Sequence, residues 1–189
     1  GLSSGVGIIV SQYFGGKDCE KVQKTIANSV YVMGSIGILM SVLTVVMAPT
    51  ILDWMNTPAD NYQYAIEYMR ITGAANIVVA IYNTISAILR ALGDSKTPLI
   101  FLIVASVINI GLDLLFVCVF KWSVMGAGLA TVISQGISAV LCLAYGFWKN
   151  PYFKLSKNNL KFNKIIAEKC FKVGMPIASQ SMLIALSCV

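Results

Sequence analysis

Residues 25–52 read TIANSVYVMGSIGILMSVLTVVMAPTIL, a run of 28 residues without a charged side chain. Three further stretches carry almost no charge: Ile71–Leu89 and Trp122–Trp148 have none, and Thr97–Phe120 has only Asp113. A helix needs about 20 predominantly apolar residues to cross a bilayer. Only 12% of the 189 residues are charged, about half the share in typical soluble domains. We therefore predict an all-α fold, a polytopic bundle of membrane helices.

The charges that flank these runs set the bounds of the expected spans. They are Gly1–Phe14, Ile26–Leu52, Tyr68–Leu89, Pro98–Phe120, Met125–Trp148 and Val173–Val189. The first and the last resemble spans cut part-way through, so we expect the sequence to be a piece of a longer membrane protein.

Basic residues are distributed unequally between the two sides that alternating connections would occupy. Gly15–Lys24, Arg90–Thr97 and Lys149–Lys172 fall on one side and hold twelve of the fourteen lysines and arginines. The other side has only Arg70 and Lys121. Positively charged loops stay in the cytoplasm, so we expect a multi-pass plasma-membrane protein with its basic loops inside. A cytoplasmic position also explains why the segment Lys149–Lys172 is rich in lysine, because cytoplasmic loops between spans are expected to be basic. We therefore expect no nucleic-acid partner.

Several kinds of catalytic and metal site have no support in the sequence. Histidine is absent, the five cysteines are not spaced as metal ligands, and no glycine-rich phosphate loop is present. We therefore predict neither an enzyme nor a bound cofactor.

Asp113 is the acid that a membrane span would hold most deeply. It lies seven residues before Phe120, which is roughly 10 Å inside the end of a helix. Intramembrane acids usually face a bundle interior or a water-filled cavity. Asn109 lies one turn deeper on the same helical face, and Thr131 of the next, antiparallel span falls at a depth between the two. Together these residues predict a cation site.

Two chemistries remain open for that site. Hard oxygen ligands suit a small cation such as Na⁺, whereas a carboxyl group in a low dielectric can carry a proton. Taken singly, Asn109 and Thr131 are more typical of hydrogen bonds between helices. The same two roles, helix pairing or lining of a substrate cavity, are open for a second polar set: Asn76, Asn83, Ser134 and Gln135.

Several strings in the chain resemble one family of transporters. Residues 90–98 read RALGDSKTP, residues 109–113 NIGLD, and residues 126–135 GAGLATVISQ. With GLSSG at 1–5, SQYFGGKD at 11–18 and GMPIASQ at 174–180, this combination resembles the multidrug and toxic compound extrusion (MATE) transporters over essentially the whole chain.

The resemblance implies a transporter of twelve helices in two lobes. Residues 1–148 would be helices two to six of the N-terminal lobe, residues 149–172 a basic cytoplasmic linker, and residues 173–189 the start of helix seven in the C-terminal lobe. It implies efflux of amphipathic, often cationic, organic compounds by H⁺- or Na⁺-coupled antiport, with alternating access of the two lobes. Asn109, Asp113 and Thr131 match positions of an N-lobe cation site that also uses an acid on helix one, outside this sequence.

Three other readings compete with drug efflux. A lipid-linked saccharide flippase of the same superfamily would have similar helices, but such proteins often need a cationic cavity and the basic residues here cluster in connections. A membrane-embedded enzyme would need a second acid or a histidine beside Asp113. A purely structural membrane subunit would leave Asp113 unexplained.

Overall fold

The computed structural model describes residues 1–55, 58–153 and 163–187, and within these ranges it contains helices and turns but no strand. In chain order, the elements are α1 (Leu2–Gly15), α2 (Cys19–Trp54), α3 (Ala59–Ala74), α4 (Asn76–Ala91), α5 (Lys96–Asp113), a π-helical turn η1 (Leu114–Val119), α6 (Ser123–Lys149), a 3-10 turn η2 (Pro151–Phe153) and α7 (Lys164–Ser187). The predicted all-α class is confirmed.

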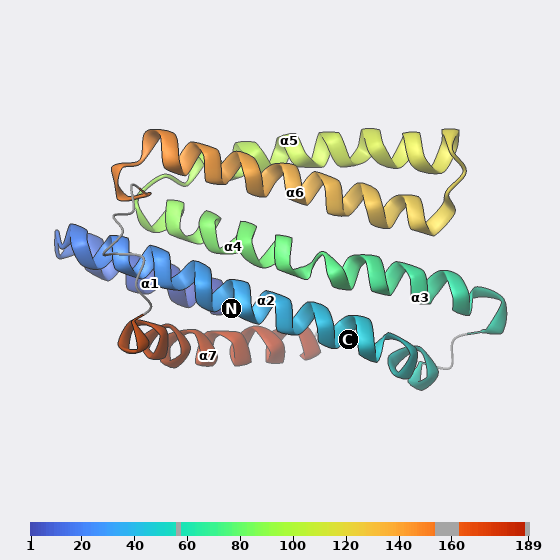
Figure 1. Cartoon of the computed structure of the whole chain (residues 1–189), viewed down its shortest axis with the longest axis horizontal. Coiled ribbons are helices and arrows are strands. Elements are labelled where there is room, and N and C mark those ends of the chain that lie inside the picture. The colour runs from blue at the N-terminus through green and yellow to red at the C-terminus, as the bar shows by residue number, and fades with distance from the viewer. Residues whose placement is uncertain (56–57, 154–162, 188–189) are drawn as a thin grey trace.

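The helices lie side by side in an elongated bundle. Figure 1 shows α5 and α6 as one pair, with α3 and α4 continuing each other beneath them and α1, α2 and α7 on the other side. Four helical segments of the described chain are long and apolar enough to cross a membrane: Cys19–Trp54, Asn61–Ala91, Lys96–Val119 and Val124–Lys149. These correspond to the four interior spans predicted from the sequence.

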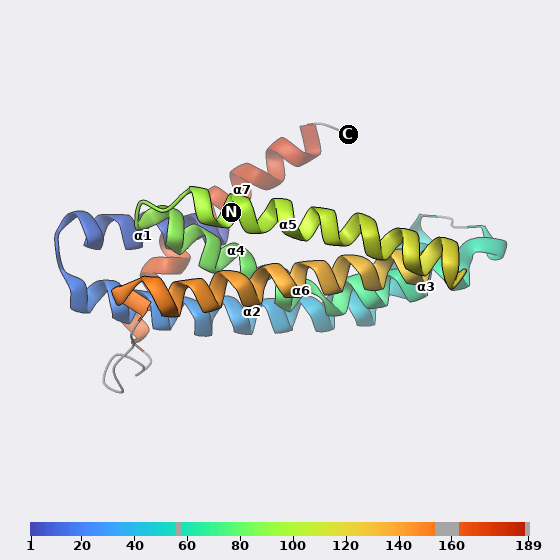
Figure 2. The same cartoon turned by 90° about the horizontal axis from the view of Figure 1, so that it is seen from above.

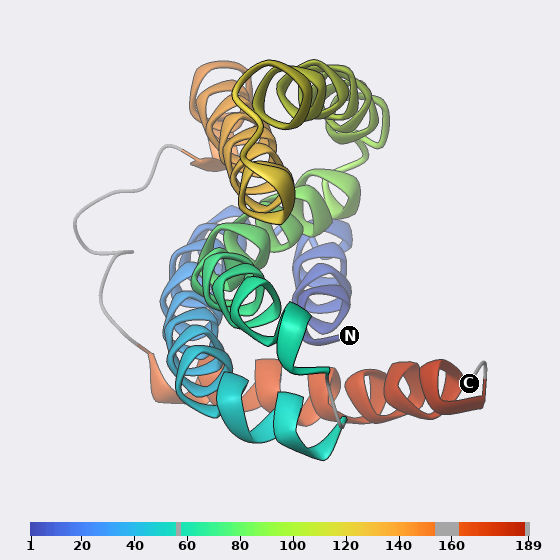
Figure 3. The same cartoon turned by 90° about the vertical axis from the view of Figure 1, so that its right-hand side faces the viewer.

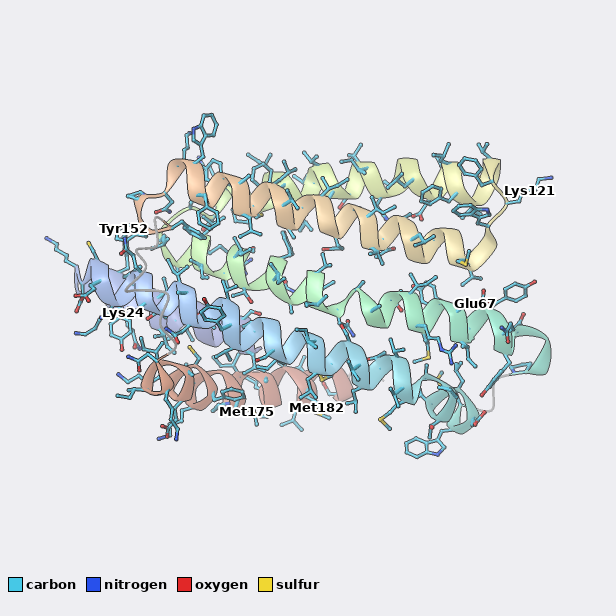
Figure 4. The ribbon with its side chains drawn as sticks, viewed as in Figure 1. Lys24, Glu67, Lys121, Tyr152, Met175 and Met182 are labelled. Atoms are coloured by element: carbon cyan, nitrogen blue, oxygen red, sulfur yellow. The ribbon has the colours of Figure 1, made fainter. Side chains whose placement is uncertain are left out.

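Consecutive connections alternate between the two ends of the bundle, as the charge pattern predicts. The α1–α2 turn, the α4–α5 turn and the end of α6 lie together at what we call the basic end, and the start of α3 and the α5–α6 turn lie at the far end (Figures 1 and 2). Figure 4 places Lys24 and Tyr152 at the basic end, and Glu67 and Lys121 at the far end.

Helices α2 and α3 both begin earlier than the predicted spans, and in α2 charged residues extend the helix. Asp18 caps α2 by accepting a hydrogen bond from the Lys21 backbone N–H at 3.1 Å. One turn later, Lys24 and Glu20 form an ion pair of 2.6 Å along the helix. Lysine and glutamate are good helix formers, so the helix continues through the charged segment and past the expected start at Ile26.

The predicted span Tyr68–Leu89 is divided at Ala75, which separates α3 from α4. Small residues surround the junction, and Gly73 packs tightly on α2: a Cβ added there would lie 2.8 Å from Thr44 Cγ2. We infer that the close approach of α2 determines where the helix is interrupted.

The apolar core lies toward the basic end, where α1, α2, α4 and α6 meet. Its most buried side chains are Val6, Val10, Val22, Ile26, Ile85, Ile88, Leu89, Cys142 and Phe153. The outer surface is also apolar, and α5 exposes Leu99, Ile103, Val107 and Ile110. Such large apolar patches suit contact with lipid or another helix better than contact with water.

The predicted linker 149–172 begins and ends in ordered contacts with the bundle. Phe153 is 2% exposed and packs over Gly146, where an added Cβ would lie 3.0 Å from the ring. Lys164–Lys172 form the first turns of α7, and the linker residues 154–162 lie outside the described ranges.

Helix α7 is attached to the bundle by its first half. The Asn163 backbone N–H donates to Asn28 Oδ1 at 2.6 Å, and Lys169 Nζ donates to the Tyr13 hydroxyl at 3.1 Å. Beyond these contacts α7 crosses beneath the bundle and projects from its side (Figures 2 and 3). The start of the predicted second lobe therefore packs against α1 and α2.

Asp94 fixes the start of α5, and removing its carboxylate is expected to destabilise the protein. Asp94 accepts hydrogen bonds from the Thr97 backbone N–H at 3.1 Å and from the Thr97 hydroxyl at 2.7 Å. Losing such a cap typically costs about 1 kcal/mol. We expect Asp94→Ala to lower the thermal unfolding midpoint of the intact protein. Ser95→Ala is the control, because the Ser95 side chain makes no capping hydrogen bond. Equal midpoints for the two variants would contradict this role.

The same cap gives a pH dependence of known sign. Burial raises the pKa of Asp94, but hydrogen bonds from Thr97 and Tyr145 outweigh it, so the pKa lies below the usual 3.8. Stability from this carboxylate is therefore present above the unfolded-state pKa and is lost as the pH falls through the lower folded-state pKa.

Candidate functional site

Asn109 and Asp113 occupy one face of α5, four residues apart, in the last turn before η1. Each is partly buried. Within the described part of the chain, the buried atoms Asn109 Nδ2 and Asp113 Oδ1 have no hydrogen-bond partner. Leaving a buried polar group unpaired costs about 1–3 kcal/mol. Two such groups on one helical face therefore suggest a site prepared for an ion or a water molecule.

A small pocket of about 70 Å³ lies beside this face, between α5 and α6. Its lining residues are Leu102, Ala105, Ser106 and Asn109 from α5, and Thr131, Ser134 and Gln135 from α6. Each water molecule occupies about 30 Å³ in the liquid, whereas sites for drug-sized ligands measure about 300–1,000 Å³. The pocket has the size for an ion with a water molecule, and is too small for a drug.

The hydroxyl groups of the pocket use their protons within their own helices, which leaves their oxygen atoms free to accept. Ser106 Oγ donates to the Leu102 carbonyl at 2.9 Å, Thr131 Oγ1 to the Ala127 carbonyl at 3.0 Å, and Ser134 Oγ to the Thr131 carbonyl at 2.9 Å. Since each proton is directed to the residue's own helix, the oxygen lone pairs remain for another partner. Oxygen atoms of this kind are ligands for hard cations.

The structure brings together four of the seven residues predicted for the two sites. Asn109, Thr131, Ser134 and Gln135 line the same pocket, although the sequence left two roles open for the last two, helix pairing or lining of a substrate cavity. Asp113 is not one of the lining residues and follows Asn109 by one turn on α5. The three predicted cation ligands therefore share one region without all facing one described cavity.

The remaining two predicted residues lie elsewhere, on α4. Asn76 Nδ2 donates to Thr44 Oγ1 of α2 at 3.4 Å, which is a helix-pairing contact. Asn83 is exposed on α4 and is not one of the residues that line the α5–α6 pocket.

Sequence reasoning missed two features of this region. Ser106 lines the pocket, and its signal was the spacing Ser106–Asn109–Asp113, three and then four residues, which defines one helical face. The π-helical turn η1 directly after Asp113 had no recognisable signal in LLFVCV. Such turns are rare in proteins overall, and those that do occur are often found at functional sites.

The fold and this region define an integral membrane protein with a candidate cation site between two antiparallel helices. The chain belongs to the MatE family, whose model matches residues 1–115, and the resemblance to MATE transporters is confirmed.

Curated relatives bear names that refer to drug resistance or export. The chain is 29% identical over 194 residues to the probable multidrug resistance protein YoeA of Bacillus subtilis, covering 99% of this chain and 42% of that protein. It is 25% identical over 172 residues to the multidrug export protein MepA of Staphylococcus haemolyticus, covering 91% and 38%. The chain thus spans about two fifths of the length of these relatives.

Solved transporters have the same fold. A MATE crystal structure in the bent conformation matches with a TM-score of 0.89 and 23% identity, over 98% of this chain and 42% of that one. An inward-facing MATE family transporter of the MOP superfamily matches with a TM-score of 0.83 and 23% identity, over 93% and 41%.

Proposed function

We propose that this chain is part of a MATE-type exporter that expels amphipathic, cationic organic compounds in exchange for inward H⁺ or Na⁺. The observation that carries the proposal is the unpartnered Asn109 and Asp113 pair beside an oxygen-lined pocket of ionic size. Family membership and the names of the relatives support the export role.

The mechanism we propose is alternating access of two lobes. An ion or proton at Asp113 and the adjacent pocket changes the charge between α5 and α6, and thereby the relative stability of the two states of the transporter. Two observations support a first lobe that moves largely as one body. The chain matches an inward-facing structure with a TM-score of 0.83 and an outward-facing one with 0.87.

The proposed orientation places the basic end in the cytoplasm and the far end outside the cell, in the plasma membrane. Lys17, Lys21, Lys24, Arg90, Lys96 and Lys149 all belong to the turns or helix ends at the basic end. Asp113 is then reached from the outer half of the bilayer, where an inward-moving cation would enter.

Transport by the intact protein in proteoliposomes tests the proposal. We expect ethidium to be moved when either an inward proton gradient or an inward Na⁺ gradient is imposed, and the movement to stop when that gradient is dissipated. The ion that drives transport identifies the coupling ion. If neither gradient moves an organic cation, while a fluorescent lipid-linked saccharide is flipped, the flippase alternative replaces export.

A further inference from the structure

A second pocket, unrelated to the α5–α6 site, lies at the far end of the bundle. It has a volume of about 250 Å³ and is formed where α3 meets the α5–α6 turn. Helix α3 contributes Tyr64 and Glu67, which are three residues apart on one face. The α5–α6 turn contributes Lys121 and Trp122, and the first turn of α6 contributes Met125.

The indole ring of Trp122 is held in place by two other rings. Its centroid lies 5.6 Å from that of Phe116 and 5.5 Å from that of Phe120, and both pairs are stacked. Gly126 allows this compact turn, because a Cβ there would lie 2.9 Å from Phe116 Cβ. Trp122 nevertheless remains 45% exposed, so an ordered aromatic surface is available to a ligand.

Glu67 supplies negative charge to the same pocket. It is partly buried, and none of the ion pairs in the described part of the chain involves it. Lys121 also lines the pocket, and its side chain extends beyond the end of the bundle, at the rim of the pocket (Figure 4). The pocket thus offers a carboxylate without a bound counter-ion beside two aromatic rings.

We propose that this pocket is an outer docking site for the cationic head group of an amphipathic organic cation. Aromatic faces attract cations, by about 0.5–1 kcal/mol at exposed sites and more when the cation is desolvated, and Glu67 adds direct charge attraction. The volume lies just below that of drug-sized sites, which limits the occupant to one quaternary ammonium or one charged ring. The inference rests on the proposed export function and adds a site on the release side.

Binding of benzyltrimethylammonium to the intact transporter in nanodiscs, followed by ligand-observed NMR, tests this site. We expect Glu67→Gln and Trp122→Leu each to raise the Kd by about three- to tenfold, and Trp122→Phe to raise it less. Lys121→Gln should lower the Kd, because it removes a positive charge from the rim. Neutral benzyl alcohol is the control probe, and its binding should not respond to the Glu67 or Lys121 substitutions.

The Glu67→Gln and Lys121→Gln substitutions are expected to change the Kd in opposite directions. Misfolding would weaken binding in both variants, so the pair separates a charge effect from misfolding. Lys121 is exposed, so its substitution should not disturb folding. If Glu67→Gln fails to fold, Lys121→Gln therefore still tests the proposed site. If all these variants bind the probe as the wild type does, the rings are only interfacial anchors and the docking site is overturned, even where export is intact. If no export occurs but binding depends on Glu67 and Lys121 as expected, the export proposal fails and the cation site stands.

Discussion

Replacing Asp113 by asparagine is expected to lower ion-driven efflux by the intact transporter by at least about tenfold. The substitution keeps the size of the side chain but removes its charge and its ability to carry a proton. Coupling free energies between two linked sites of about 1–3 kcal/mol correspond to about 5- to 150-fold effects. If the proposed ion or proton binds at Asp113, losing it should therefore remove most of the coupling. The measurement is the initial rate of ethidium efflux under a fixed proton or Na⁺ gradient.

A matched acid-to-amide change elsewhere serves as the control for Asp113→Asn. Asp53, near the end of α2, accepts a hydrogen bond from the Tyr62 hydroxyl at 2.7 Å, and an amide oxygen can accept the same bond. We expect Asp53→Asn to transport within about twofold of the wild type, as surface substitutions usually change little. Wild-type efflux by Asp113→Asn, under the same gradient and at the same protein level, would show that Asp113 has no part in coupling.

The pairing of α5 with α6 could be predicted from the sequence because it depends on local patterns. The four-residue connection Lys121–Val124 forces two apolar runs to return antiparallel, and helical periodicity then places Asn109 and Asp113 on one face. The depth estimate for Thr131 brought it to the same region, and the shared pocket agrees. Rise per residue and helical spacing are sufficient for this part of the site.

The departures from the sequence prediction arise from contacts between distant segments or from weak local signals. The break at Ala75 has no proline to mark it and lies where Gly73 meets Thr44 of α2. The π-helical turn η1 follows an apolar run that is equally compatible with a regular helix. A serine such as Ser106 in a long apolar run often bonds its own backbone, as it does here, and therefore carries little weight until a facing helix is known.

The crossing of α1 and α7 was the least predictable contact, because it joins the first residues of the chain to the last. Gly5 and Gly174 meet there: a Cβ added to Gly5 would lie 2.5 Å from Gly174 Cα. Nothing in the sequence pairs these two glycines. Their close approach attaches α7, the predicted start of the second lobe, to α1 by direct backbone contact.

Gly5→Ala is therefore expected to destabilise the intact protein by about 1–3 kcal/mol, the usual cost of overpacking a close contact. The new methyl group would meet backbone atoms of α7, which cannot rotate away. Gly174→Ala should cost less, because its nearest neighbour is Leu2 Cδ2 at 2.8 Å, the tip of a flexible side chain. At Gly34 an added Cβ would have no described atom within 4 Å apart from its chain neighbours and the adjacent backbone of its own helix. Gly34→Ala should therefore be neutral or slightly stabilising, since alanine is the better helix former. The crossing is supported if the thermal unfolding midpoint is lowest for Gly5→Ala, intermediate for Gly174→Ala and highest for Gly34→Ala. A midpoint for Gly5→Ala at or above that of Gly34→Ala would show that α1 and α7 are not in backbone contact.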